Sequence, residues 1–113
     1  MHLKSARVVY IAHPLGSGPE RETNRQNASK WVAWAAKTFG VAPIADWIIL
    51  SGEWSEDLRE LGLFIDKTLI ERCDAVWLCG GRVSPGMAIE RDHALEHGVA
   101  VVDLIHYGPL PPS

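Results

Sequence analysis

Two carboxylic acids, Asp66 and Glu90, lie in sequence contexts that can turn them toward a cleft. Asp66 interrupts the apolar stretch LGLFIDKTLI, and Glu90 follows Met87 by three residues in the stretch SPGMAIERDHALEHG. At about 100° per residue, Glu90 lies about 60° from Met87, on the flank of an apolar helical stripe. Two such groups can cleave a glycosidic bond, one attacking or stabilising the sugar cation and the other moving the proton. A solvated position is the ordinary alternative for each of them.

Tyr10 and His13 mark the end of the apolar run RVVYIA and the start of the loop after it. A tyrosine hydroxyl at this place can donate a hydrogen bond to a carboxylate and hold it in position. Packing within a strand is the alternative role for Tyr10.

Two glycine-rich loops, HPLGSGPER and GGRVSPGM, each follow an apolar run and lead into a helical pattern. Free backbone N–H groups at helix starts favour an anionic ligand, although the glycines can also serve only tight turns. Neither loop has the GxGxxG or P-loop pattern, and we expect no cofactor. The candidate substrate-binding residues are His13, Pro14, Gly16, Gly18, Arg21, Trp47, Gly81, Ser84, Gly86 and Met87. Trp47 and Trp54 can stack on a base, or can simply pack in the core.

His93 and His97 are four residues apart and would share one face of a helix. This spacing suits a metal ion, but no third ligand is evident from the sequence and the HExxH pattern of zinc proteases is absent. We therefore expect no metal site.

Apolar runs and helical periodicities alternate along the chain. We predict strands at 7–12, 41–45, 74–80 and 99–105 and helices from 19 to about 38, over 56–73 and over 84–98. Thr23–Gln26 matches a capping box, Gly40 should end the first helix, and Ser55 and Ser84 should be the N-caps of the second and third helices. We expect residues 46–57 to form a partly structured loop. The order β-α-β-α-β-α-β predicts a small flavodoxin-like or Rossmann-like doubly wound parallel sheet, with strand order 2-1-3-4. Its ligand site should lie beyond strands one and three, where the strand order reverses.

The chain has 113 residues, 47% of them hydrophobic, and a net charge of −3. These values suit one soluble domain over 1–113 with an extended tail at 106–113, and they argue against duplex nucleic acid as a partner. We expect no membrane association and a cytoplasmic location, with Cys73 and Cys79 as free thiols.

Five tryptophans are many for one small core. Trp31 and Trp34 on the first predicted helix, and Ile89 on the outer side of the third, suggest apolar surface that a second copy would cover. We expect a homo-oligomer built on dimers.

The segments VVYIAHPL, DKTLIERCDAVWLCGG and SPGMAIERDHALEHGVAVV together resemble the nucleoside 2-deoxyribosyltransferase-like superfamily, especially its short bacterial and phage members. That superfamily includes the nucleoside 5′-monophosphate N-glycosidases and has a small flavodoxin-like fold. The resemblance implies that Glu90 attacks C1′ of the sugar, that Asp66 protonates the departing base and that Tyr10 orients Glu90. It also implies a phosphate contact at Ser84, a nucleoside or nucleotide substrate, and an oligomer in which a neighbouring subunit completes the pocket.

Two other functions remain open at this level. The same crevice can belong to a non-catalytic nucleotide-binding or sensing module. The segment CGGRVSPGMAIE also loosely resembles the GGxGTxxE loop of cytokinin-activating phosphoribohydrolases, which would imply ribose monophosphate substrates.

Overall fold

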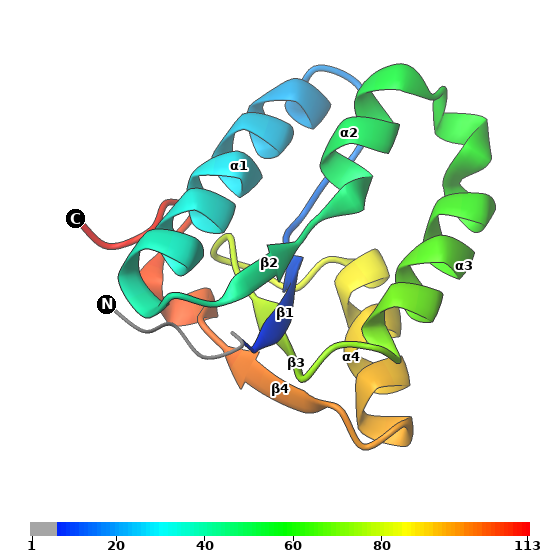
Figure 1. Cartoon of the computed structure of the whole chain (residues 1–113). Coiled ribbons are helices and arrows are strands. Elements are labelled where there is room, and N and C mark those ends of the chain that lie inside the picture. Colours follow the sequence, from blue (N-terminus) through cyan, green and yellow to red (C-terminus); the bar gives the residue numbers. More distant parts are fainter. Residues whose placement is uncertain (1–6) are drawn as a thin grey trace.

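The computed structural model describes residues 7–113 and contains a four-stranded parallel sheet in the order β2-β1-β3-β4 (Figure 1). The strands are β1 (Val8–Ala12), β2 (Ala42–Ile44), β3 (Ala75–Leu78) and β4 (Ala100–Asp103). In the centre, Tyr10 of β1 pairs with Ile44 on one side and Val76 on the other. The predicted doubly wound fold class and strand order are therefore confirmed, and all four strands end at the same edge of the sheet.

Helices cover both faces of this sheet. They are α1 (Glu20–Phe39), α2 (Asp46–Glu53), α3 (Arg59–Ile70) and α4 (Pro85–Glu96), with single 3₁₀ turns η1 (Glu56–Leu58) and η2 (Ile105–Tyr107). Because side chains alternate along a strand, β1 serves two cores. Val9 and Ile11 pack on the α1 side of the sheet with Trp31 and Ala35.

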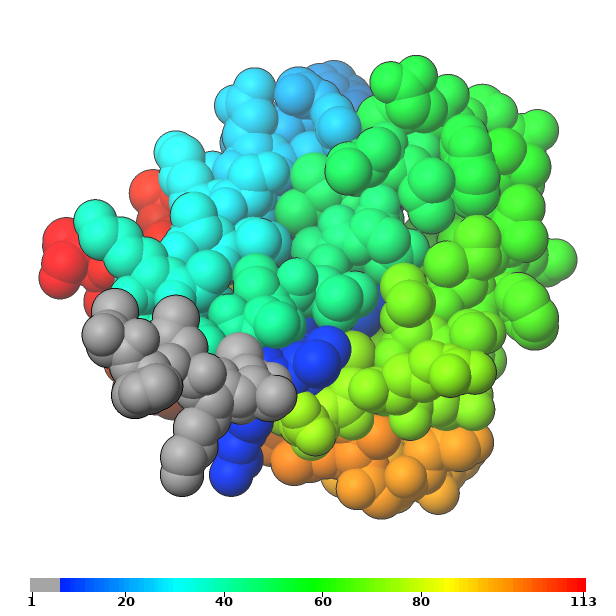
Figure 2. All heavy atoms as spheres, in the orientation of Figure 1, coloured from blue at the N-terminus to red at the C-terminus, as the bar shows by residue number. Residues whose placement is uncertain are grey.

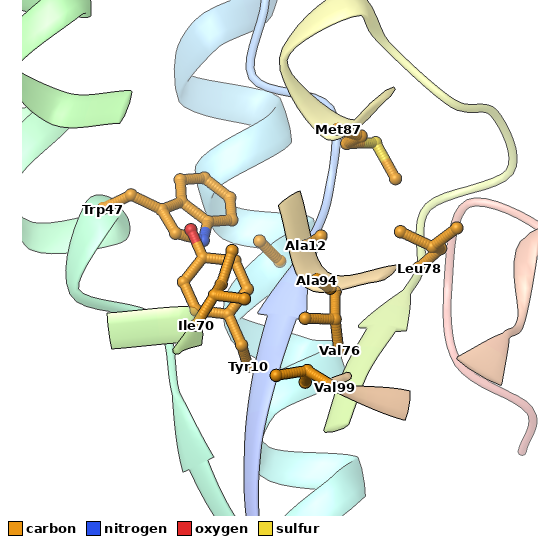
Figure 3. Packing of buried hydrophobic residues seen from close by; sticks show 10 residues of the cluster. Tyr10, Ala12, Trp47, Ile70, Val76, Leu78, Met87, Ala94 and Val99 are labelled. Atoms are coloured by element: carbon orange, nitrogen blue, oxygen red, sulfur yellow. The ribbon is translucent and has the colours of Figure 1, made fainter. Parts of the chain in front are cut away.

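The second core lies on the opposite face. Tyr10 and Ala12 of β1 meet Trp47, Ile70 and Met87, which come from α2, α3 and α4 (Figure 3). This core contains the Tyr10 hydroxyl, so a polar group is buried among apolar side chains and requires a hydrogen-bond partner.

The prediction of a loop at 46–57 was wrong, because α2 forms over Asp46–Glu53. The Trp47 side chain is buried in the core, and two arginines of α1 donate hydrogen bonds to carbonyl groups of α2. Arg25 Nε donates to Ile48 O at 2.9 Å, and Arg21 Nη2 donates to Ser51 O at 3.1 Å. These tertiary contacts outweigh the turn-forming residues Ser51 and Gly52.

The predicted ends of the other helices were correct only in part. Gly40 ends α1 with φ 66°, and Ser84 caps α4 by accepting a hydrogen bond from the Met87 N–H. The Thr23–Gln26 capping box was wrong, since α1 already begins at Glu20, where Pro19 has a helical φ and acidic residues occupy the first turn. Ser55 precedes η1, not a continuous helix, and makes no capping hydrogen bond to the backbone.

Trp31 was wrongly expected at the surface, since its side chain is fully buried. Its Nε1 donates to Pro109 O at 2.9 Å, so the segment after η2 crosses α1. The predicted tail at 106–113 therefore begins within η2 and is anchored to the domain. Ile89 is 39% exposed, as expected. No helix within residues 7–113 has both the length and the apolar character needed to cross a bilayer.

Candidate active site

Tyr10 and Glu90 form the centre of the candidate site. The Tyr10 hydroxyl donates a hydrogen bond of 2.7 Å to Glu90 Oε2, and the Glu90 residue is only 6% exposed. Burial raises the pKa of Glu90, while the hydrogen bond from Tyr10 acts in the opposite direction. The solvated alternative for Glu90 is therefore excluded: its side chain points inward, toward the end of β1.

Asp66, on α3, is equally buried and faces Glu90 from the neighbouring helix. Burial raises the pKa of Asp66 to about 9, and the charge of Glu90 adds to the effect. Two carboxyl groups so close together cannot both ionise easily, so they hold one proton between them near neutral pH. The phenolic donor at Glu90 Oε2 stabilises a negative charge there, which favours an ionised Glu90 beside a protonated Asp66.

A third carboxyl group, Asp46, was missed by the sequence interpretation. It lies at the start of α2, directly after β2, and burial raises its pKa. Both of its carboxylate oxygens are buried with no hydrogen-bond partner among residues 7–113. Its position at the carboxyl end of a parallel strand was the available signal, but the incorrect loop assignment hid it.

The two catalytic candidates open into a cavity of about 300 Å³. Apolar side chains of α2 and the residues after it, Trp47, Leu50 and Trp54, form part of its wall. The cavity lies beyond the carboxyl ends of the strands, because His13 follows β1, Trp47 follows β2 and Ser84 follows β3. This is the place where open parallel sheets bind ligands.

Three arginines from separate segments, Arg21, Arg59 and Arg82, also line the cavity. Arg21 lies 4.0 Å from Glu56 Oε1, whereas Arg59 and Arg82 form no ion pair with any other residue in 7–113. The Arg59 charge lowers the pKa of Glu90. Only Arg21 was among the predicted binding residues. The wall of the cavity therefore carries two positive charges, on Arg59 and Arg82, that no carboxylate within residues 7–113 pairs directly.

The β3–α4 loop positions Glu90 through its cap. Ser84 Oγ accepts from Met87 N at 3.3 Å, and Met87 anchors the first turn of α4 in the core. Glu90 follows one turn later on the same side. In this loop Gly80 has φ 100°, and a Cβ atom there would lie 2.6 Å from His13 Cδ2. His13 is thereby fixed against the loop, and its Nδ1 donates to Pro14 O at 2.7 Å.

The structure brings most of the predicted binding residues together. Those that line the cavity are His13, Gly16, Arg21, Trp47, Ser84, Gly86 and Met87. Three others do not line it. Pro14 is fully buried, Gly18 borders a separate shallow depression beside α1, and Gly81 packs against Gly108 and Pro109.

A family model described as a domain of unknown function, DUF7768, matches residues 7–104. The chain belongs to the DUF7768 family. No curated protein matches it significantly.

The part of the chain matched by DUF7768 contains every titratable group of the site described above, from Tyr10 to Glu90. It also contains the whole sheet and all four helices, from Val8 to Asp103. The candidate site is therefore a feature of the DUF7768 domain itself.

Proposed function

We propose that this DUF7768 domain cleaves or transfers the N-glycosidic bond of a nucleoside or a nucleoside 5′-monophosphate. One observation carries the proposal: two buried carboxyl groups from separate helices, Asp66 and Glu90, meet at the wall of one cavity. Such a pair supplies the nucleophile and the acid that glycoside cleavage requires.

The chemistry proceeds in two steps. Glu90 attacks C1′, a carboxylate–carbon bond forms, and the electron pair of the breaking C1′–N bond passes to the base, which takes the Asp66 proton. Water or a second base then attacks C1′ and gives a proton to the Asp66 carboxylate, while the bond between C1′ and the Glu90 oxygen breaks and its electron pair returns to the Glu90 carboxylate. The Tyr10 hydroxyl holds the attacking group in place.

The rest of the cavity suits the base at one end of such a substrate and the phosphate at the other. The indole of Trp47 and the side chains of Leu50 and Trp54 offer an apolar wall for a base. Arg59 and Arg82 offer positive charge for a phosphate, and Ser84 stands at the N-terminus of α4, where anions bind favourably.

Incubation with a panel of nucleosides and nucleoside 5′-monophosphates, followed by chromatography for free base, tests the proposal. The domain should release base from at least one member. A Glu90→Ala variant should lose this release but still bind the same compound in calorimetry. Binding without release by the unaltered chain would instead support a nucleotide-sensing module.

We also propose that the domain forms homodimers. Ile49 on α2 and Phe64 on α3 are 71% and 68% exposed, more than any other large apolar side chain within residues 7–113. Both belong to helices that wall the cavity, and Figure 2 shows the two helices side by side on one face of the molecule. A second copy covering this surface would also shield the site from water.

A further inference from the structure

Three side chains of metal-ligating type meet outside the cavity, where α3 and α4 end. They are Glu71, which follows α3, His93 in the last turn of α4 and His97 at its C-cap. One ligand atom from each residue can be chosen so that all three lie within 4.8 Å of one another. The sequence showed only the two histidines, because Glu71 is twenty-two residues before His93 and reaches it only through the packing of α3 on α4.

The distances are close to those of a metal site. Glu71 Oε2 lies 2.8 Å from His93 Nε2 and 4.0 Å from His97 Nε2. Ligand atoms of a tetrahedral zinc ion are about 3.3 Å apart, given bonds of about 2.0 Å. Because Glu71 and His97 are exposed, small rotations of their side chains suffice to reach that spacing.

One hydrogen bond of the cluster prepares a ligand atom, and another must be replaced by the ion. His93 Nε2 donates to Glu71 Oε2 at 2.8 Å, so an ion bound there takes the place of the Nε2 proton, which is released. His97 Nδ1 lies 2.9 Å from His93 O, and since a carbonyl oxygen only accepts, Nδ1 carries the proton. The lone pair of His97 is then on Nε2, the atom that faces Glu71. A backbone carbonyl that fixes the tautomer of a histidine in this way is a common outer partner of zinc-binding histidines.

We propose that Glu71, His93 and His97 bind a divalent transition-metal ion of the zinc type, with an open fourth position for water. Two imidazoles and one carboxylate form a donor set suited to zinc and poorly suited to calcium or magnesium, which prefer oxygen ligands. The negative end of the α4 dipole also favours a cation at this place. The ion would fasten the end of α3 to the end of α4, the two helices that carry Asp66 and Glu90.

Zinc titration of the tag-free chain in a calorimeter tests the proposal, with His97→Gln and Glu71→Gln as variants and His106→Gln as the matched control. His106 is an exposed histidine outside the cluster. We expect one zinc ion per chain, affinity about tenfold or more lower in each cluster variant, and unchanged affinity in His106→Gln. Magnesium should give no binding.

Thermal unfolding separates binding from a folding defect. Zinc should raise the Tm of the unaltered chain and of His106→Gln, whereas the two cluster variants should unfold at the same temperature with zinc or with EDTA. Absence of zinc binding by the unaltered chain would overturn the proposal, and so would undiminished affinity in both cluster variants.

Discussion

Tyr10, Asp66 and Glu90 form one buried group, so the ionisation of each depends on the other two. The charge of Glu90 contributes to the raised pKa of Tyr10 and of Asp66, after burial as the main cause in both. The sequence predicted these three residues as partners, and the structure confirms that they meet. The sequence could not decide whether the Asp66 side chain points inward or into solvent, because that depends on how α3 is rotated against α4.

Replacement of Tyr10 by Phe removes the hydrogen bond to Glu90 Oε2. A hydrogen bond to a charged group contributes about 1.5–3 kcal/mol, so we expect kcat to fall by about 10–100-fold. The loss of the donor should also raise the pKa of Glu90, which moves the acidic limb of the pH–rate profile to higher pH. Rates of base release across pH measure both effects. Tyr107→Phe, at a tyrosine that is 52% exposed, is the control and should leave the profile unchanged.

Asp66 should make stability depend on pH. Its pKa is raised from 3.8 to about 9, so between these values the folded chain keeps a proton that the unfolded chain has lost. Its contribution to the free energy of unfolding is therefore greatest below pH about 4 and falls as the pH rises toward 9, by at most about 1.4 kcal/mol per pH unit.

The Asp66→Asn variant lacks this titration. The stability of the variant relative to the unaltered chain should therefore increase from pH 5 to pH 8, two values that lie between the unfolded and the folded pKa of Asp66, roughly 4 and 9. Urea denaturation at both pH values measures the difference. A stability difference that is the same at both would show that Asp66 is not protonated in the folded chain.

At the scale of elements, local pattern predicted the strands and the three longest helices, with errors of a few residues at their ends. The four runs of β-branched and aromatic residues are too apolar to be exposed, and their alternation with amphipathic segments leaves one reasonable topology. The helix α2 could not be predicted in this way, since Trp47 burial and the α1 arginines that satisfy its carbonyls are long-range contacts. Because α2 was not predicted, Asp46 at its start was not recognised as part of the site.

The β3–α4 loop offers a test of how tightly an element fixes the site. Gly80 and Gly98 both have positive φ, but a Cβ at Gly80 would lie 2.6–2.7 Å from His13 and Pro14, while a Cβ at Gly98 meets nothing within 4 Å. Gly98→Ala should therefore cost only the backbone strain, about 1–2 kcal/mol. Gly80→Ala should cost about 1–3 kcal/mol more because of overpacking. Equal losses in urea denaturation would show that the loop can move away from His13.

At the scale of the whole molecule, a small sheet and four helices leave several large apolar side chains exposed. Composition predicted this surplus and Ile89 is exposed as expected, but Trp31 was assigned to it wrongly, since Trp31 is buried under the segment that contains Pro109. Which tryptophans are covered depends on the path of the last residues, and no local pattern encodes that path.

The proposed dimer predicts a sedimenting mass of about twice the 12.5 kDa of the chain. Phe64→Ser should shift the equilibrium toward the monomer, because it removes exposed apolar surface from α3. Leu110→Ser, on the terminal segment, should leave the mass unchanged. Analytical ultracentrifugation over a range of concentrations measures all three, and a monomeric mass for the unaltered chain throughout would exclude the dimer.

The proposed reaction requires that Glu90, and not merely an acidic helix surface, attacks the sugar. Glu90 and Glu96 are both on α4, but Glu90 is buried at the cavity and Glu96 is exposed. The most direct measurement is the rate of base release by the unaltered chain, Glu90→Gln and Glu96→Gln, with the nucleoside or nucleotide that reacts fastest. We predict a loss of about 1,000-fold or more in Glu90→Gln, since a neutral amide cannot replace the carboxylate nucleophile, and no change in Glu96→Gln. Base release that survives in Glu90→Gln, or that is absent from the unaltered chain with every compound, would exclude Glu90 as the nucleophile of a glycosidic cleavage.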